Sequence, residues 1–385
     1  MKINKEKEWK KIHICLCYSS YSQVIGGVEI NIRKISEYLA NKGYKVTVLC
    51  SDKNNKNKKE ETINGVRIGY VKSYFNIFKV PFAPLYWHEL SKIKPDLIHA
   101  FGTMPGFSDV SIIYAKKNKI PCLLSYRFDG NAESLIGQFF AYIYNLTINK
   151  IVVKLADKIT TTGISYASTS LVLKGIMDKV TIITNGVDLK LFNGELNKKK
   201  CEYSLPEGKI ILWVGRFVRY KGLEYLIKAM KYVHEGTLVI IGFGALEKKL
   251  KELTKRENLI KKIHFIGHVY NEELPYFYHK AYVYVLSSIT RGENCTNSST
   301  EAMSCGVPVI ASDLPGVRDL ITDNVGFRVQ PKDSRGIAEK INYLFANETI
   351  RERMSKEGVR KAQNYSWGKV SKKYLDLYKE LLHIE

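Results

Sequence analysis

Two carboxylates in one polar stretch are the first residues whose spacing points to chemistry. Glu293 and Glu301 bracket the stretch ENCTNSSTE, with seven residues between them. A carboxylate that faces a ribose accepts hydrogen bonds from both hydroxyls, as in dinucleotide sites, and a second carboxylate can do the same for another sugar. Ser298 and Glu301 also fit a helix capping box, which explains Glu301 without any ligand. Glu293 is left without a structural role, so it is the stronger functional candidate.

Two cations stand on the loop that follows the first predicted strand of the second half. Arg216 and Lys221 lie in the stretch VGRFVRYKG. Arginine can bind two oxygens of a diphosphate at once, and lysine supplies a point charge. In so basic a chain the alternative is a pair of solvated side chains, and each residue taken singly favours that interpretation.

Glycines follow two predicted strands and precede a helix in each case. Gly26 and Gly27 come after IHICLCYSS, and Gly242 and Gly244 come at the end of TLVIIGFG. Glycine lets the backbone approach a ligand, and a helix N-terminus favours anions. For the first pair a tight turn is the simpler explanation. The second pair lacks the third glycine of the dinucleotide fingerprint, which gives a nicotinamide cofactor little support.

Alternating strands and helices must position these residues. Short apolar runs such as KVTVLC, DLIHAF, IILWV and TLVII are separated by amphipathic helical patterns. This β-α-β order predicts parallel sheets, in which ligands bind beyond the carboxyl ends of the strands. The chain has 385 residues, too many for one ordinary core. We therefore predict an α/β protein with two Rossmann-like, doubly wound parallel-sheet domains that face each other across a cleft.

The predicted boundary lies where the pattern weakens, in the polar stretch FNGELNKKKCEYSLPEG, after which the alternation restarts. We assign residues 1–190 to an N-terminal Rossmann-like domain. Residues 191–365 form a C-terminal Rossmann-like domain, and residues 366–385 form a final helix.

Composition narrows the partners and the compartment. The net charge is +22, and both halves of the chain are basic, which implies anionic partners. The basic residues are dispersed and match no RNA-binding motif, so no specific nucleic acid is expected. The seven cysteines form no CxxC pair, which indicates reduced thiols in a cytoplasmic protein. No segment reads as a transmembrane helix.

The motifs together resemble those of the retaining GT-B-fold glycosyltransferases, the group often called glycosyltransferase family 4. The resemblance covers nearly the whole chain and rests on five motifs in the expected order. These are GGVE from Gly26, TNGVD from Thr184, the Gly-Arg-x4-Lys-Gly element Gly215–Gly222, the E-x7-E pair with the frame that continues to VPVIASDLPG, and the closing segment YSWGKVSKKYLDLYKELL. The resemblance implies that residues 1–190 form the acceptor-side domain and that residues 191–365 form the nucleotide-sugar-binding domain. In this family the closing helix, here residues 366–385, crosses back onto the N-terminal domain.

The resemblance implies roles for individual residues. Glu301 would hold the ribose hydroxyls of a nucleotide-sugar donor, and Glu293 would face the donor sugar. Arg216 and Lys221 would stabilise the leaving diphosphate. Further donor-binding positions would be supplied by backbone N–H groups and loops: Asn294, Cys295, Thr296, Asn297, the Gly26–Gly27 loop and the Gly242–Gly244 loop.

One position departs from the family pattern. Many members carry a histidine after the strand written here as CLLSY, whereas this chain has Arg127. Arginine cannot act as a base because its charge is permanent. Arg127 would instead contact a sugar or phosphate, oriented by Asp129. His99 aligns with another frequent family histidine, for which a structural role is at least as well supported.

The implied reaction is transfer of a glycosyl group from a nucleotide diphosphate sugar to a hydroxyl of a glycan or lipid-linked glycan, with retained configuration. The sequence contains no DxD motif, so no metal and no other cofactor is expected. Two alternatives remain: a nucleotide-sugar epimerase of the same fold, which needs no acceptor, and a non-catalytic basic module that binds nucleotides or nucleic acid. The mixed aromatic and basic segment Ser73–Lys94 suggests peripheral contact with an anionic membrane, or a core helix preceded by an apolar loop.

Overall fold

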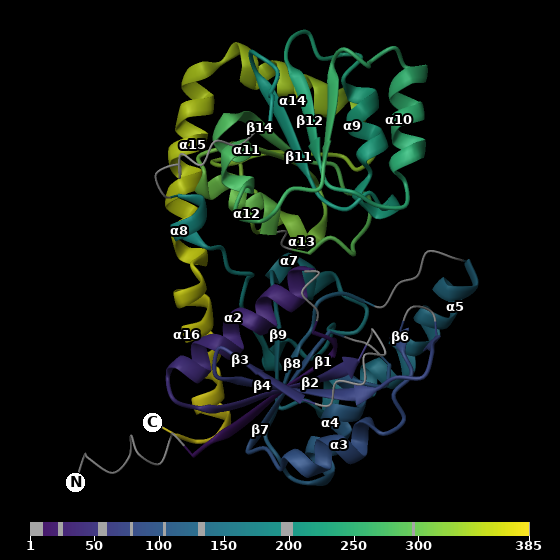
Figure 1. Ribbon diagram of the computed structural model, residues 1–385, viewed down its shortest axis with the longest axis vertical. Helices are drawn as coiled ribbons and strands as arrows, with labels where there is room; N and C mark the ends of the chain where they lie inside the picture. Colours follow the sequence, from purple (N-terminus) through teal and green to yellow (C-terminus); the bar gives the residue numbers. More distant parts are fainter. Residues whose placement is uncertain are drawn as a thin grey trace, which may run out of the picture. The chain divides into compact units, whose positions relative to one another are not determined.

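The computed structural model describes residues 11–21, 26–52, 60–77, 80–102, 105–129, 135–193, 203–294 and 297–384. The chain forms two compact units, one made of Met1–Thr184 with Trp367–Glu385 and the other of Asn185–Ser366 (Figure 1). The chain therefore passes from the first unit to the second between Thr184 and Asn185, before the predicted boundary after Lys190. The reason is local, since the Val187 N–H donates to the Tyr365 carbonyl at 2.7 Å, which ties this segment to the second unit.

The first unit is built on a mostly parallel sheet. Its strand order is β10-β9-β8-β7-β1-β2-β4-β3, parallel throughout except for the antiparallel pair β3–β4. The strand bounds are β1 His13–Ser20, β2 Lys45–Asp52, β3 Glu60–Ile63, β4 Val66–Lys72, β7 Leu97–Phe101, β8 Cys122–Ser125, β9 Lys158–Thr161 and β10 Val180–Ile182, with a separate hairpin of β5 Asn76–Ile77 and β6 Val80–Pro81.

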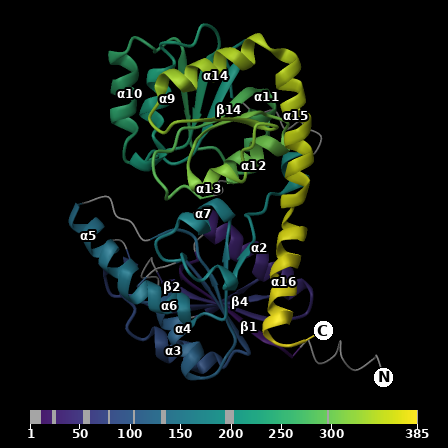
Figure 2. The same ribbon diagram turned by 180° about the vertical axis from the view of Figure 1, so that it is seen from behind.

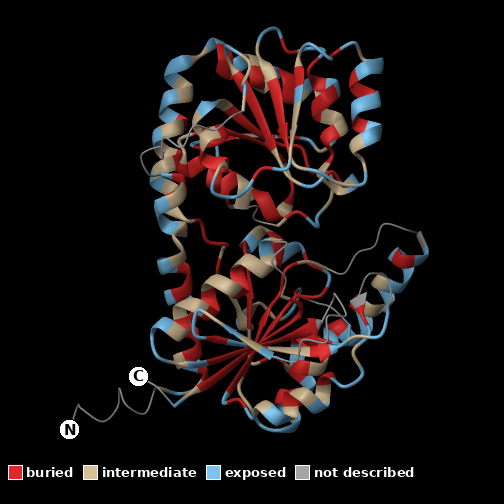
Figure 3. Cartoon of the chain, in the orientation of Figure 1, coloured by how far each residue is buried: buried red, intermediate tan, exposed pale blue. Residues whose placement is uncertain are grey.

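Helices cover both faces of this sheet. One face packs against α2 and α16 through residues such as Ile35 and Tyr374, and the other packs against α3, α4, α6 and α7 through residues such as Leu90 and Val153. The helix bounds are α2 Gly27–Asn41, α3 Tyr86–Ile93, α4 Ser108–Lys117, α5 Leu135–Tyr144, the π-helical turn η1 Asn145–Asn149, α6 Lys150–Leu155, α7 Ile164–Thr169 and α16 Trp367–Leu381. The buried strands between these layers form the core (Figure 3).

The second unit has a fully parallel sheet in the order β13-β12-β11-β14-β15-β16. Helices again lie on both faces, with α9, α10 and α14 on one and α11 and α12 on the other. The bounds are β11 Ile210–Val214, β12 Thr237–Ile241, β13 Ile263–Gly267, β14 Ala281–Leu286, β15 Val309–Ser312, β16 Gly326–Val329, α8 Leu189–Phe192, α9 Leu223–Ala229, α10 Glu247–Arg256, α11 Leu274–Lys280, α12 Asn297–Ser304, α13 Pro315–Arg318, α14 Ser334–Ala346 and α15 Glu348–Ala362. The predicted α/β class with two doubly wound units is confirmed.

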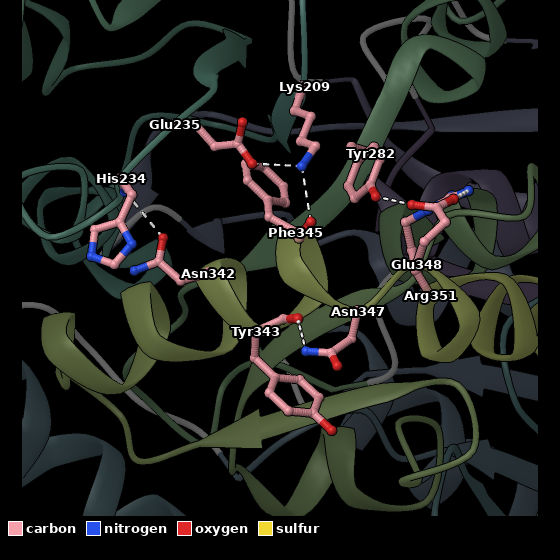
Figure 4. Close-up of polar contacts among 10 residues, drawn as sticks. All are labelled: Lys209, His234, Glu235, Tyr282, Asn342, Tyr343, Phe345, Asn347, Glu348 and Arg351. Atoms are coloured by element: carbon pink, nitrogen blue, oxygen red, sulfur yellow. Dashed lines mark hydrogen bonds and ion pairs between the residues drawn. The ribbon is translucent and has the colours of Figure 1, made fainter.

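At the amino-terminal edge of the second sheet, polar groups satisfy one another (Figure 4). The Lys209 ammonium donates to Glu235 at 2.5 Å and to the Phe345 carbonyl at 2.9 Å, and it lies 5.3 Å from the ring centre of Tyr282. The Tyr282 hydroxyl in turn donates to Glu348. These contacts join the amino-terminal edge of the second sheet to α14 and α15. The candidate site residues lie at the opposite, carboxyl edge of this sheet.

Candidate active site

The strand order of the second unit reverses between β11 and β14. From β11 the chain continues outward to β12 and β13, then returns to place β14 on the other side of β11. In open parallel sheets, ligands bind at the carboxyl edge of such a switch point. The loop after β11 carries Lys221, and the loop after β14 carries Glu293. The topology therefore brings together two of the sequence-predicted residues.

Lys221 and Glu293 form an ion pair. The Lys221 Nζ lies 2.6 Å from Glu293 Oε2, and the two side chains are only 12% and 7% exposed. The Ser288 hydroxyl donates to the same carboxylate oxygen. Burial alone would lower the pKa of Lys221, but the neighbouring Glu293 carboxylate outweighs it and the pKa lies above its usual value. The Lys221 ammonium therefore keeps its charge beside the Glu293 carboxylate, and little solvent reaches the pair.

This pair corrects the view that Glu293 lacks a structural role. A buried charge that loses its partner is strongly unfavourable, so Glu293 stabilises the Lys221 loop whatever else it does. The two roles are compatible, because an ion pair at a ligand-binding edge also fixes the direction of both side chains.

Glycine geometry holds the Lys221 loop against β14. Gly222 has φ of 58°, and a Cβ there would lie 2.2 Å from the Ser287 carbonyl oxygen. The Ser287 hydroxyl donates to the Lys221 carbonyl at 3.1 Å, and the Ile289 N–H donates to the Tyr220 carbonyl at 2.8 Å. The final glycine of the Gly-Arg-x4-Lys-Gly element is thus required by close backbone packing and a left-handed conformation.

The Glu293 loop packs in the same way against α13. Asn294 forms an isolated β-bridge with Gly316, the glycine of the LPG stretch. A Cβ on Gly316 would lie 2.3 Å from the Glu293 carbonyl oxygen and 2.6 Å from the Asn294 Cα. A glycine far along the chain therefore sets the position of the Glu293 backbone.

Glu301 lies in α12, where the structure contradicts the capping box. The helix begins at Asn297, so Ser298 is inside it, and the Ser298 hydroxyl accepts from the Tyr284 hydroxyl at 2.7 Å. The Glu301 carboxylate accepts from the Tyr278 hydroxyl at 3.0 Å. Burial raises the pKa of Glu301 to about 7, although the hydrogen bond from Tyr278 opposes the rise. The expected helix stop is present, since Gly306 has φ of 73° after α12 ends at Ser304.

The remaining candidates of the second unit differ in setting. Arg216 is exposed and donates to the Tyr220 hydroxyl at 3.4 Å, and its positive charge weakly opposes the rise in the pKa of Lys221. Gly242 has a clear packing role, because a Cβ there would lie 1.8 Å from the Gly215 carbonyl oxygen. A Cβ on Gly244 would likewise lie 2.7 Å from the Phe217 carbonyl oxygen.

The segment between Glu293 and α12 is described only in part. Cys295 and Thr296 lie outside the described residues. Asn294 is half-buried, and Asn297 opens α12, where its side-chain oxygen accepts from the Asn185 amide at 3.1 Å. Asn185 belongs to the TNGVD motif, so this contact joins two of the sequence motifs within the second unit.

Three predicted site residues belong to the first unit. Gly26 precedes α2 as its N-cap with φ of −91°, and Gly27 is the first helical residue. Arg127 is buried and lies 6.0 Å from the ring centre of Phe101. Asp129, which was expected to orient Arg127, accepts from the hydroxyls of Tyr126 and Ser170 at 2.7 and 2.5 Å.

His99 has a structural environment. One ring nitrogen lies 2.6 Å from the Tyr378 hydroxyl and the other 2.7 Å from the Ser125 hydroxyl. Burial and the nearby Arg127 charge lower the pKa of His99 well below its usual value. A neutral histidine with both nitrogens engaged supports the structural alternative.

Sequence reasoning missed the neutral groups that hold the charged ones. Ser288 follows the strand YVYVL and contacts Glu293, while Tyr278 and Tyr284 reach Glu301 and Ser298 from α11 and β14. Tyrosines in apolar runs look like ordinary core residues. Only the packing of α11 and β14 against α12 distinguishes them.

Comparisons with known proteins agree with this arrangement. The family model described as Glycosyltransferase Family 4 matches residues 25–191, and the model described as Glycosyl transferases group 1 matches residues 197–361. The first match contains every strand of the first sheet except β1, and the second contains the whole second sheet. The chain belongs to the group 1 glycosyltransferases.

Relatives and structural neighbours of this glycosyltransferase cover its whole length. An uncharacterized glycosyltransferase of Methanocaldococcus jannaschii is 25% identical over 93% of this chain and 95% of its own. Sucrose-phosphate synthase from Thermosynechococcus elongatus has a TM-score of 0.81 at 23% identity, covering 97% of this chain and all of the neighbour. An Anabaena protein in complex with UDP-glucose has a TM-score of 0.76 at 17% identity, covering 96% of this chain and 100% of the neighbour. The glycosyltransferase therefore has the GT-B fold.

Proposed function

We propose that this glycosyltransferase transfers a hexose from a nucleotide diphosphate sugar to a hydroxyl of a glycan or lipid-linked glycan, with retention of configuration. The observation that carries the proposal is the buried Lys221–Glu293 pair at the switch point of the second sheet. Glu301 lies in α12, the first helix after the Glu293 loop. A structural neighbour is named as a complex with UDP-glucose, which supports a nucleotide-sugar donor.

Each charged residue has a proposed role in donor binding. Glu301 accepts hydrogen bonds from the ribose hydroxyls, and Glu293 faces the donor sugar while it holds Lys221. Lys221 and Arg216 meet the negative charge that develops on the leaving diphosphate, an electrostatic effect worth about 10²–10³ in rate for one preorganised contact. Backbone N–H groups of the segment Asn294–Asn297, which includes Cys295 and Thr296, bind the sugar and diphosphate.

The proposed chemical step needs no protein nucleophile. The bond between the anomeric carbon and the diphosphate oxygen breaks, and a bond to the acceptor oxygen forms on the same face of the sugar. The proton of the acceptor hydroxyl passes to the departing phosphate oxygen. We propose that the two cations supply the positive charge and that no metal ion is required. In the first unit, Arg127 and the Gly26–Gly27 loop are proposed to contact substrate oxygens.

A cytoplasmic enzyme at the surface of an anionic membrane is the proposed setting. The described cysteines Cys15, Cys17, Cys50, Cys122 and Cys305 are free thiols, and the net charge of +22 favours anionic surfaces. Across the described residues, we find no helix with the length and apolar character needed to cross a bilayer.

A panel of nucleotide sugars, screened by thermal stabilisation and then by transfer, tests the function. Binding to the folded state alone raises the unfolding midpoint. With the selected donor, Lys221→Ala and Glu293→Gln should reduce transfer by about 10²–10³. Matched controls come from the Lys231–Glu257 pair of the same unit, which lies away from the site, with side chains 46% and 17% exposed and an Nζ–Oε2 distance of 2.8 Å.

The controls Lys231→Ala and Glu257→Gln should transfer at the wild-type rate. Wild-type turnover in both site variants would remove the site assignment. Nucleotide release that does not depend on acceptor would instead point to an epimerase or hydrolase. The anomeric configuration of the product, measured by NMR, decides retention.

A further inference from the structure

The helical segment α5–η1–α6 exposes apolar side chains that globular proteins usually bury. The segment runs without a break from Leu135 to Leu155 and extends away from the sheet of the first unit (Figures 1 and 2). Eight large apolar or aromatic residues on it are exposed, with Ile136 at 68% and Phe139 at 61%. The full set is Ile136, Phe139, Phe140, Tyr142, Ile143, Leu146, Ile148 and Ile151.

The inward side of α5 and η1 is small or polar. Gly137, Asn145 and Asn149 are buried, and the Asn149 amide donates to the Asn145 side-chain oxygen at 3.0 Å. Among the described residues of the segment, Val152 and Val153 of α6 are buried in the core of the first unit, and Tyr144 at the end of α5 is half-buried. The hydrophobic pattern of α5–η1 is thus inverted, because its apolar groups face outward. Exposed apolar patches of this kind mark interaction surfaces.

Charge identifies the partner. Between Leu135 and Ala156 the sequence contains no aspartate or glutamate, and its only charged residues are Lys150 and Lys154, both exposed. A helix with apolar and aromatic groups flanked by lysines is typical of the interface between water and an anionic bilayer. A second copy of this chain would instead bring together two molecules that each carry +22.

We propose that α5–η1–α6 docks the protein on anionic lipid, with the apolar side chains in the headgroup region and Lys150 and Lys154 near the lipid phosphates. This locates the membrane contact on a different segment from Ser73–Lys94. In that segment α3 buries Tyr86 and Leu90, as the core-helix alternative predicted, although Tyr74, Phe75 and Phe82 are exposed. The inference rests on the proposed function for one point only, the reason why the protein would dock on a membrane: a lipid-linked acceptor would lie in the same bilayer.

Vesicle co-sedimentation of the full chain, without nucleotide sugar, tests the docking surface. Wild-type protein should sediment with phosphatidylcholine vesicles that contain phosphatidylglycerol, and much less with phosphatidylcholine alone. Phe139→Ser and Phe140→Ser should each lower the partition coefficient by about tenfold. Lys150→Ala should lower it about fivefold, and only with phosphatidylglycerol present.

Matched controls separate this surface from general stickiness and from catalysis. Leu171→Ser replaces another residue of the first unit that is 57% exposed and should bind vesicles like wild type. Lys221→Ala should also bind normally, so failed transfer and failed docking are distinguishable. Ile136→Ser with Ile151→Ser provides an independent second variant, and circular dichroism checks the fold of each.

Three outcomes overturn the proposal. One is wild-type vesicle binding by both the phenylalanine and the isoleucine variants. Another is equal loss in Leu171→Ser, which would show that any exposed apolar residue suffices. The third is a wild-type dimer in solution that fails to bind vesicles and that the phenylalanine variants dissociate, which would assign the surface to a second copy.

Discussion

At the scale of single residues, the effect of replacing Glu293 on stability depends on what the substitution leaves beside the buried Lys221 ammonium. Glu293→Ala would leave the buried Lys221 ammonium unpaired, which typically costs about 3–5 kcal/mol. We therefore expect Glu293→Ala to lower the free energy of unfolding of the second unit, whereas the sequence alone left Glu293 without a structural role. Urea unfolding followed by the second unit's Trp213 fluorescence measures this. The control Glu247→Ala, at a paired carboxylate of the second unit that is 42% exposed, should leave the curve unchanged, and equal curves for both variants would contradict the prediction.

Glu301 gives a second residue-scale prediction, on pH. Its folded-state pKa is raised from 4.5 to about 7, so between those values the folded protein holds a proton that the unfolded chain releases. The stability from this group is full below pH 4.5 and is lost as pH rises through about 7. The slope is about 1.4 kcal/mol per pH unit at most. As the pH rises from 4.5 to about 7, the unfolding midpoint of the wild-type protein should fall relative to the midpoint of Glu301→Gln.

The same protonation should control donor affinity in the opposite direction. If ribose hydroxyls donate to the Glu301 carboxylate, binding requires the ionised form, and the affinity should fall about tenfold per pH unit below pH 7, as for any single ionisation with the pKa of about 7. Calorimetric titration of the donor at several pH values measures this. A pH-independent Kd in wild type would remove Glu301 from the ribose site.

At this scale the motifs singled out Glu293, Lys221 and Arg216 as candidate site residues. They did not predict the contact between Lys221 and Glu293, which joins residues 72 positions apart. Strand order decides such a contact, and local patterns do not encode it. The capping box failed for a related reason, since Tyr284 and Tyr278 take the side-chain oxygens of Ser298 and Glu301 from neighbouring elements.

At the scale of elements, backbone packing between loops should be as sensitive as the charges. Gly316→Ala would place a Cβ 2.3 Å from the Glu293 carbonyl oxygen, so the Glu293 loop has to move. We expect a loss of kcat/KM of about 10²-fold, since a displacement of roughly 1 Å has that effect on a positioned group. The control is Gly368→Ala in α16, where a Cβ meets nothing within 4 Å. Normal transfer by Gly316→Ala would show that the loop is not positioned this way.

Element prediction succeeded where periodicity was strong. Strands β11 and β12, which lie beside each other below the site, match the predicted runs IILWV and TLVII. The antiparallel β3–β4 pair was not anticipated, because EETI and VRIGYVK are short and half-exposed and so resemble surface loops. The outward apolar face of α5 was also missed, because composition alone cannot tell a buried helix from an exposed one.

At the scale of the whole molecule, two separate cores follow from the alternation of strands and helices, but the boundary depends on tertiary contacts. The polar stretch after Lys190 suggested the division there, whereas the Val187 contact with Tyr365 assigns the preceding residues to the second unit. The C-terminal segment Trp367–Glu385, in contrast, belongs to the first unit. Its helix α16 buries Val370, Tyr374 and Tyr378 in the core of the first unit.

This arrangement predicts a selective effect of truncation. Removing the chain after Ser366 would expose the α2 and β1 core face that α16 covers, and losing Tyr374 alone should cost about 3–5 kcal/mol. We expect residues 11–184 to lose protection from amide hydrogen exchange while residues 203–366 stay protected and still respond to donor, because Lys221, Glu293 and Glu301 lie in that unit. Lys372→Ala, an exposed change on α16, should alter neither. Loss of protection in both units would show that the second cannot fold without the first.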